Sequence, residues 1–297
     1  MNHLDGTVAG TKVEGIKVVW DTAVFKHGFE PQIISGISSS AMFSVPYALG
    51  IHNSKFRNKL NDFLNTFTLD TLFKKKPLNK KNNLSIRAVF RAITKKAAIG
   101  HLRIDEVLKS LISVKDFVLY QSQDKYANCI VMSVDFKTGN KVITSLKEVS
   151  YDEFILHCLA SASVPIYSVP ITINDMILYD GGVRGSSCAA DVMRKYKPSC
   201  TLSVFSFPKQ LVTENDGWLP INIFAVLKRL FDITLGEISE NSRKEQEIVA
   251  KENKSTLYQT FLPKILKSEF DTNRERLNML KTKAAAIIPF AKSNLVT

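Results

Sequence analysis

The chain has 297 residues, of which 45% are hydrophobic, and a formal net charge of +12. This length fits one large α/β domain or two small ones. No apolar run approaches the roughly 20 residues that span a bilayer. The first ten residues lack a basic stretch followed by an apolar one, so we expect no secretory signal.

The cysteines are widely spaced and form no C-x-x-C pair: Cys129, Cys158, Cys188 and Cys200. This pattern predicts buried thiols in a reducing compartment, and so a cytoplasmic protein. Neither the cysteines nor the five histidines show a metal-ligand spacing. We therefore expect no bound metal and no other cofactor.

Between Asp70 and Asp105 the chain has no acidic residue but many basic ones. The basic residues are Lys74, Lys75, Lys76, Lys80, Lys81, Arg87, Arg91, Lys95, Lys96 and Arg103. Such a block favours a polyanionic partner, either an anionic membrane surface or nucleic acid. Arg87, Arg91 and Lys95 would share one helix face and could lie on a membrane. The alternative is an ordinary solvated or packed amphipathic helix.

The first 36 residues have a strand, loop, helix, strand pattern. We expect a strand over Leu4–Gly10, a glycine-bounded loop to Gly15, and a helix over Ile16–His27. This order predicts a parallel sheet covered by helices. A glycine loop at a helix N-terminus offers free N–H groups to an oxyanion or a phosphate, although a plain turn is the alternative. It is not a Walker loop, because the G-K-[ST] ending is missing.

The stretch Gln32–Gly50 reads QIISGISSSAMFSVPYALG. It predicts a short strand, a sharp serine-rich turn and an apolar helix, the arrangement with which hydrolases expose a nucleophilic hydroxyl. The usual turn is G-x-S-x-G; here Gly36 is the first glycine and Ser40 replaces the second. Ser38 is the candidate nucleophile. The alternative is that Ser38 only caps the helix.

The remaining chain continues the α/β pattern. Residues 54–117 look helical and basic, and from about 221 to 297 the chain again looks helical. Between these regions we expect strands Cys129–Phe136 and Val142–Leu146, helix Tyr151–Ser161, strand Met176–Tyr179, helix Ser187–Tyr196 and strand Thr201–Phe207. We therefore predict one α/β domain over 1–297, with a basic helical insert at about 54–117 and a helical C-terminal region at about 221–297.

A candidate acid follows the strand Met176–Tyr179. Asp180-Gly181-Gly182 places a carboxylate at the end of this strand, where open α/β sheets carry their chemistry; the alternative is a turn aspartate. No histidine follows His157, so the Ser, acid, His order of α/β-hydrolases cannot use Asp180. His52 and His101 remain available, but the simplest arrangement is a dyad in which Asp180 is the base for Ser38.

These motifs together resemble the patatin-like phospholipases. LDGTVAGTKVEGIKVVWDTAV is similar to the first strand, the oxyanion loop G-G-G-x-[KR]-G and the next helix of that family. SGISSSA resembles its nucleophile elbow, and ASASVPIYSVPITINDMILYDGGV its A-S-x-x-x-P segment and D-G-[GA] motif. SEFDTNRERLNML is similar to a segment before the last helix. The resemblance implies a three-layer sandwich with a mostly parallel central sheet and helices on both faces.

The resemblance also implies roles for single residues. Ser38 matches the nucleophile and Asp180 its partner, with Gly36, Gly181 and Gly182 as the elbow and dyad glycines. The oxyanion would rest on backbone N–H groups of the loop and the elbow: Gly10, Thr11, Lys12, Val13 and Ser39. The implied reaction is hydrolysis of a phospholipid or other glycerolipid ester through an acyl-enzyme, at an anionic membrane surface and without a metal.

Several positions depart from the family pattern. Thr11 and Lys12 replace the middle loop glycines, Glu14 replaces the usual basic residue, and Ser40 replaces the second elbow glycine. Thr and Lys resist the positive φ that glycine accepts, and loss of one oxyanion donor costs roughly 100- to 1000-fold in rate. These departures predict weakened activity.

Two alternatives stay open at this stage. One is a pseudoenzyme that keeps the fold and binds lipid or a protein partner; an activating protein partner is also compatible with the sequence. The other is a nucleic-acid binder that uses the basic block, which we disfavour because no reader motif accompanies it.

Overall fold

The computed structural model describes residues 1–67, 71, 103–165, 167–206, 223–266, 271–287 and 295–296. The helices are α1 (Val13–Asp21), α2 (Ser39–His52), α3 (Ser54–Thr66), α6 (Ile104–Leu111), α7 (Val114–Ser122), α8 (Tyr151–Ser161), α9 (Ala189–Tyr196), α10 (Ile223–Asn253) and α11 (Arg274–Ala285). Three short turns of helix are η1 (Gly10–Lys12), η2 (Thr22–Lys26) and η3 (Gly181–Val183). The strands are β1 (Asn2–Gly6), β2 (Ile33–Gly36), β3 (Asn128–Asp135), β4 (Lys141–Ser145), β5 (Ile171–Ile173), β6 (Met176–Asp180), β7 (Cys200–Phe205), β8 (Thr256–Phe261) and β9 (Leu295–Val296).

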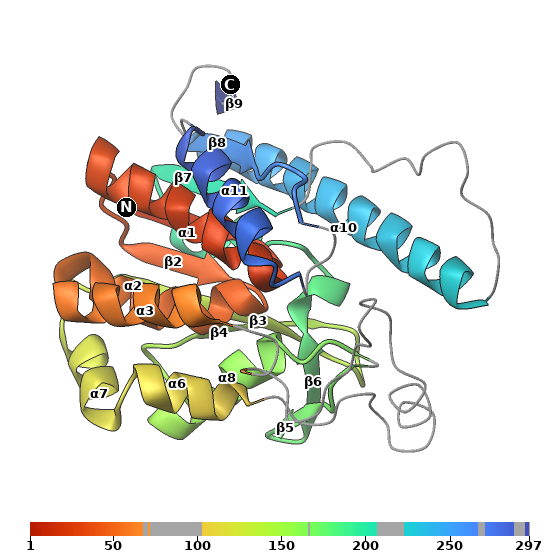
Figure 1. The fold of residues 1–297 in the computed structure, drawn as a ribbon, viewed down its shortest axis with the longest axis horizontal. Helices are drawn as coiled ribbons and strands as arrows, with labels where there is room; N and C mark the ends of the chain where they lie inside the picture. Colours follow the sequence, from red (N-terminus) through yellow and green to blue (C-terminus); the bar gives the residue numbers. More distant parts are fainter. Residues whose placement is uncertain are drawn as a thin grey trace.

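The described strands form one mixed sheet (Figure 1). Its centre is parallel, with β3 beside β2, then β1, β7 and β8. The remaining strands are antiparallel: β4 and β6 pair with β3, β5 pairs with β6, and β9 pairs with β8. Parallel neighbours need crossover connections, and the helices between these strands provide them. The predicted α/β class is confirmed.

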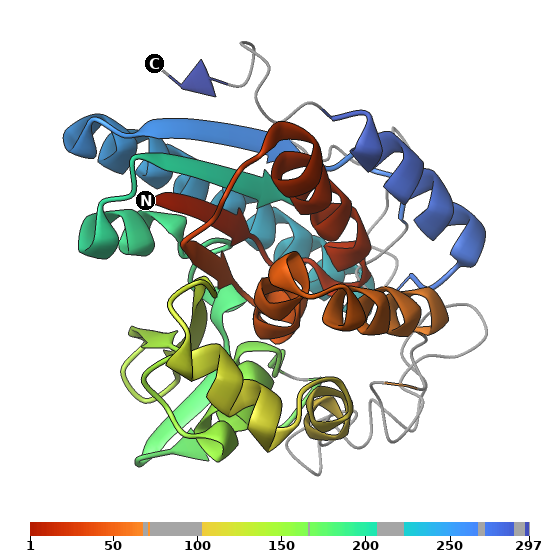
Figure 2. The ribbon, with the colours of Figure 1, turned by 90° about the vertical axis from the view of Figure 1, so that its left-hand side faces the viewer.

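Helices cover both faces of the sheet. Leu4 and Ile34 point into the main core, where they pack with side chains of α1, α2, α8 and α11. Figure 2 shows α1 and α11 side by side next to the parallel strands. On the opposite face Leu257 of β8 packs against Ala190 of α9 and Val249 of α10. Because side chains alternate along each strand, each face of the sheet packs against its own apolar layer, as a three-layer sandwich requires.

The pairing along β3 brings β2 and β6 end to end. Ile130 pairs with both β2 and β4, so these two strands lie on opposite edges of β3. Ser133 pairs with both β4 and β6, so β6 lies on the same edge as β2. β2 ends opposite Val131 and β6 ends with Asp180 opposite Ser133. Two residues of strand separate these levels, about 7 Å.

The element boundaries differ from the sequence prediction in several places. The first strand ends at Gly6, not Gly10, and the predicted helix Ile16–His27 begins earlier, at Val13, and ends in the π-helical turn η2. The C-terminal region predicted as helical also contains the strand β8. The predicted helix Tyr151–Ser161 is present as α8, and the region predicted as helical from about 221 to 297 contains α10 and α11. No helix in the described ranges is both long and apolar enough to cross a membrane.

Much of the predicted basic insert falls on residues 68–70 and 72–102, outside the described residues. Its described ends, α3 and α6, are helical as expected. The expectation that residues 1–297 form a single domain stays a prediction.

Candidate active site

Ser38 lies at the apex of a sharp turn between β2 and α2. Its φ of 60° and ψ of −127° are rare for a residue with a side chain. Ser38 is 7% exposed. Gly36 makes the turn possible, because a Cβ on it would lie 2.6 Å from the Ser40 carbonyl carbon. The predicted strand, turn and helix are therefore present, and Ser38 is at the position that projects a hydroxyl.

The replacement of the second elbow glycine by Ser40 is accommodated by packing and by a hydrogen bond. The Ser40 hydroxyl donates to the Thr7 carbonyl oxygen at 2.8 Å. Across from it, a Cβ on Gly6 would lie 3.0 Å from the Ser40 Cβ. A side chain at 40 fits because position 6 has none. The hydroxyl also ties the elbow to the segment that leads into η1.

Asp180 ends β6 and is 2% exposed. Its Oδ1 accepts the Gly182 N–H at 2.8 Å, whereas its buried Oδ2 has no hydrogen-bond partner among the described residues. Burial raises the pKa of Asp180 to about 7, and hydrogen bonds from the Gly182 amide and the Ser38 hydroxyl oppose this rise. The Ser38 hydroxyl is thus close enough to lower the pKa of Asp180, although the Asp180 Oδ2 atom has no hydrogen-bond partner of normal geometry among the described residues. Such contacts often tighten only when substrate is bound.

The two glycines after Asp180 allow close contacts on both sides. A Cβ on Gly181 would lie 2.7 Å from the Met132 carbonyl oxygen, and one on Gly182 would lie 2.6 Å from a Val8 methyl. Real Cβ atoms do not approach other atoms so closely, so both positions require glycine. The Asp180 turn is therefore pressed against β3 and against the segment between β1 and η1.

The predicted oxyanion loop forms η1, directly before α1. Only Gly10 in it has a positive φ, 52°. Thr11 and Lys12 therefore occupy their positions without the strain that the sequence suggested. Lys12 N–H already donates to the Ala9 carbonyl at 2.9 Å, and Val13 N–H donates to the Gly10 and Thr11 carbonyls. The Lys12 and Val13 N–H groups are therefore already bonded within the chain, which reduces the predicted set of oxyanion donors.

Three of the predicted donors remain available to a ligand. Within the described ranges, the backbone N–H groups of Gly10, Thr11 and Ser39 have no protein acceptor. The Thr11 and Ser39 hydroxyl groups are also buried there without a partner. Ser39 begins α2, so its N–H points out of the positive end of a helix. These amides can stabilise negative charge on an oxygen.

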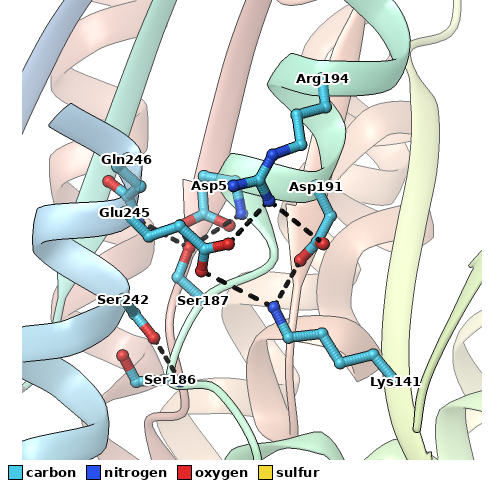
Figure 3. Close-up of polar contacts among 10 residues, drawn as sticks. Asp5, Lys141, Ser186, Ser187, Asp191, Arg194, Ser242, Glu245 and Gln246 are labelled. Carbon is cyan, nitrogen blue, oxygen red and sulfur yellow. Dashed lines mark hydrogen bonds and ion pairs between the residues drawn. The ribbon is translucent and has the colours of Figure 1, made fainter. Parts of the chain in front are cut away.

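Behind the Asp180 turn, the loop that leads to α9 is held by α10 (Figure 3). The Ser242 hydroxyl accepts the Ser186 N–H at 3.0 Å, and the Gln246 amide donates to the Ser187 hydroxyl at 2.8 Å. Ser187 in turn donates to the buried Asp5 carboxylate at 2.7 Å. The loop is thus fixed to both α10 and β1.

Ion pairs at the surface surround the contact between this loop and α10 (Figure 3). Lys141 of β4 lies 2.9 Å from Asp191 of α9 and 3.8 Å from Glu245 of α10. Arg194 of α9 also pairs with Glu245, at 2.7 Å. The arrangement joins three elements around the loop that follows Asp180.

Asp5, which accepts the Ser187 hydroxyl, is buried in β1. Burial raises the pKa of Asp5, while hydrogen bonds from Ser187, Ser35 and Ser203 lower it.

Ser161, the last residue of α8, is not among the predicted site residues. Its Oγ accepts the N–H of Ser38 at 3.0 Å. The signal for it was the A-S-x-x-x-P segment, which the sequence analysis used only for the resemblance.

The predicted membrane-binding residues cannot be placed relative to this site, because they fall outside the described ranges. Lys74, Lys75, Lys76, Lys80, Lys81, Arg87, Arg91, Lys95 and Lys96 lie outside the described residues. Among the described residues, no group of three or more His, Cys, Asp or Glu side chains is arranged to hold a metal ion. The four cysteines are free thiols, three of them buried.

The fold and the serine turn define a class: an α/β protein with a serine at a strand-to-helix elbow and an aspartate at a neighbouring strand end. A family model described as "Patatin-like phospholipase" matches residues 15–193, more than half of the chain. The chain belongs to this family, and membership supports a lipid acyl hydrolase at the level of the family.

Two further comparisons add little to this assignment. A search of curated proteins gave no significant match. Among solved structures, the chain is similar to VipD from Legionella pneumophila, with a TM-score of 0.41 and 11% sequence identity. The similarity covers 96% of this chain and 65% of the VipD chain.

Proposed function

We propose that the chain is a serine-dependent lipid acyl hydrolase with Ser38 as nucleophile and Asp180 as its base. The observation that carries the proposal is the Ser38 hydroxyl beside a buried carboxyl whose pKa is about 7. A base whose pKa lies near the operating pH combines a useful ionised fraction with enough basicity to take a proton. An ordinary surface aspartate would be ionised but weakly basic.

In the acylation step, Asp180 takes the proton from Ser38 Oγ as this oxygen attacks the ester carbonyl carbon. The carbonyl oxygen becomes an oxyanion, which accepts hydrogen bonds from N–H groups of Gly10, Thr11 and Ser39. The carbonyl then re-forms and the bond to the lipid alkoxide breaks. Asp180 gives its proton to this leaving oxygen, and the acyl group stays on Ser38.

In the deacylation step, Asp180 takes a proton from water as the water oxygen attacks the acyl carbon. The same N–H groups hold the second oxyanion. Its collapse expels Ser38 Oγ, which recovers the proton from Asp180, and the fatty acid leaves. The dyad is then back in its starting state.

We further propose that the substrate is a phospholipid or another glycerolipid held at an anionic membrane surface. The family assignment supports a lipid substrate. The formal charge of +12 supports attraction to an anionic surface, because cationic proteins concentrate at such surfaces through long-range electrostatics.

The test is fatty-acid release from vesicles of phosphatidylglycerol and phosphatidylcholine by wild type, Ser38→Ala and Asp180→Asn. We expect release by wild type, and rates at least about 1000-fold lower for both variants. Ser44→Ala is the matched control, because Ser44 is also buried in α2 and its hydroxyl contacts the Ala41 carbonyl and the buried Cys129 thiol, neither of which belongs to the proposed dyad. Equal rates for wild type and Ser38→Ala would contradict the proposal. Vesicle binding without any release would favour the lipid-binding pseudoenzyme.

A further inference from the structure

The end of α8 and the residues directly after it contact both halves of the proposed dyad. Ser161 has no exposed surface, and its Oγ accepts the Ser38 N–H at 3.0 Å. The same hydroxyl donates to the Met132 carbonyl of β3 at 2.7 Å. One side chain thus connects the elbow, α8 and the central sheet.

The aspartate is held two residues further along the same segment. The Ser163 carbonyl oxygen accepts the Asp180 N–H at 2.9 Å. The Ser163 hydroxyl donates back to the Leu159 carbonyl at 2.8 Å, and this hydrogen bond fixes Ser163 to the last turn of α8. The distance between the Ser38 backbone and the Asp180 backbone is therefore set through one short stretch, Ser161–Ser163.

The elbow peptide needs such a contact. The ladder between β2 and β3 ends at Gly36 and Val131, so the strand gives the Ser38 N–H no partner. A buried amide without a partner is costly, and so is a buried carbonyl such as that of Met132. A hydroxyl satisfies both at once because it accepts and donates. No apolar side chain at 161 can do so.

We propose that Ser161 is a positioning residue that orients the Ser38 peptide. Its hydrogen bond holds Ser38 in the positive-φ conformation that turns the hydroxyl toward Asp180 and leaves the Ser39 N–H directed at the developing oxyanion. This inference rests on the proposed function, and it adds a residue that acts through Ser38 and touches no substrate. Acylation and deacylation both need this orientation of Ser38, so we expect loss of the Ser161 hydrogen bond to lower kcat.

The variants are Ser161→Ala and Ser161→Cys, with hydrolysis of p-nitrophenyl butyrate as the assay. For Ser161→Ala we expect kcat to fall about 10- to 100-fold while KM changes less than about twofold, because a small misplacement of the reacting group has effects of this size. Ser161→Cys keeps the shape but has a weak donor and acceptor, so we expect an intermediate kcat. Ser168→Ala is the matched control, because Ser168 is buried and the one described contact of its hydroxyl is with the Val164 carbonyl.

A second measurement separates positioning from general loss of structure. We expect faster hydrogen exchange at the Ser38 amide of Ser161→Ala, with unchanged exchange in β7 and a circular dichroism spectrum like that of wild type. If Ser161→Ala does not fold, Ser161→Cys decides. Wild-type kcat in a folded Ser161 variant would overturn the inference and leave the proposed function standing. An inactive wild type would overturn the proposed function, and the inference with it.

Discussion

At the scale of single residues, the decisive feature is a carboxyl group whose pKa is raised by burial to about 7. Among the residues that the structure describes, one oxygen of Asp180 has a hydrogen-bond partner, the other has none, and no basic side chain compensates its charge. A fully solvated or ion-paired aspartate would be a poor proton acceptor at neutral pH. In the mechanism proposed above, burial would make Asp180 the base, in place of the histidine of a Ser-His-Asp triad.

This burial leads to a prediction for the pH dependence of kcat/KM. The ionised form of Asp180 is the active one, and its pKa is about 7. We expect kcat/KM for p-nitrophenyl butyrate to rise about tenfold per pH unit below pH 7 and to level off above it. The measurement is a pH profile from 5 to 9, with the stability of the protein checked at each pH. A rate that falls between pH 6 and pH 8 would contradict the role of Asp180 as base.

Part of the site could be predicted from the sequence, and the reason is local. Ser38, Gly36, Asp180 and its two glycines lie in short motifs whose backbone requirements are visible in the residue types. The A-S-x-x-x-P segment marks Ser161 in the sequence, but its contacts could not be predicted, because its partners Ser38 and Met132 are 123 and 29 residues away. The sequence likewise could not show that Gly6 makes room for Ser40.

At the scale of elements, Glu14 shows how a departure from the family pattern is absorbed elsewhere. The Glu14 side chain is 2% exposed and lies 3.1 Å from Arg274 and 3.3 Å from Lys281, both on α11. Arg274 also donates to the Leu64 and Phe67 carbonyls at the end of α3. Burial raises the pKa of Glu14, and the charges of Lys281 and Arg274 oppose that rise. The C-terminal helix thus supplies the cations beside η1 and α1.

We predict that Glu14→Lys destabilises the protein by about 2–4 kcal/mol. It places three cations together, and the loss is below that for a fully buried pair because Arg274 is 35% exposed. The measurement is urea unfolding of the single variants and of Glu14→Lys combined with Lys281→Glu. The exchanged pair should recover part of the loss. If the losses in unfolding free energy of the two single variants simply add up in the double variant, the contact between Glu14 and Lys281 does not contribute to stability.

Helices with clear periodicity could be predicted from the sequence, whereas the strand β8 could not. α8 and α11 have apolar positions at helical spacing and end at turn residues. β8 was missed because its six residues follow a long charged helix. Its burial depends on the distant β7, with which every one of its residues pairs.

At the scale of the whole molecule, the positive charge is the property that bears on the partner. The formal charge is +12, and ten basic residues without an acidic one lie between Asp70 and Asp105. Attraction to an anionic surface acts over about a Debye length, which is about 10 Å at 0.1 M salt, and therefore weakens as salt is added.

We predict that exchanging Lys74, Lys75, Lys76, Lys80 and Lys81 for Gln weakens binding to phosphatidylglycerol vesicles by more than about 100-fold. Each lysine near such a surface contributes about 1 kcal/mol. The control carries the same charge change at five exposed lysines elsewhere: Lys109, Lys115, Lys244, Lys251 and Lys283. The measurement is vesicle co-sedimentation at several salt concentrations. Equal weakening in both variants would mean that only the total charge counts.

The most direct test of the account is the site and rate of covalent labelling by an alkyl fluorophosphonate. This reagent phosphonylates a hydroxyl oxygen and loses fluoride, so it reports an activated serine without turnover. We predict a single adduct, on Ser38, with labelling at least about 100-fold slower in Asp180→Asn. An adduct on another residue, or equal labelling rates in wild type and Asp180→Asn, would contradict the Ser38–Asp180 dyad.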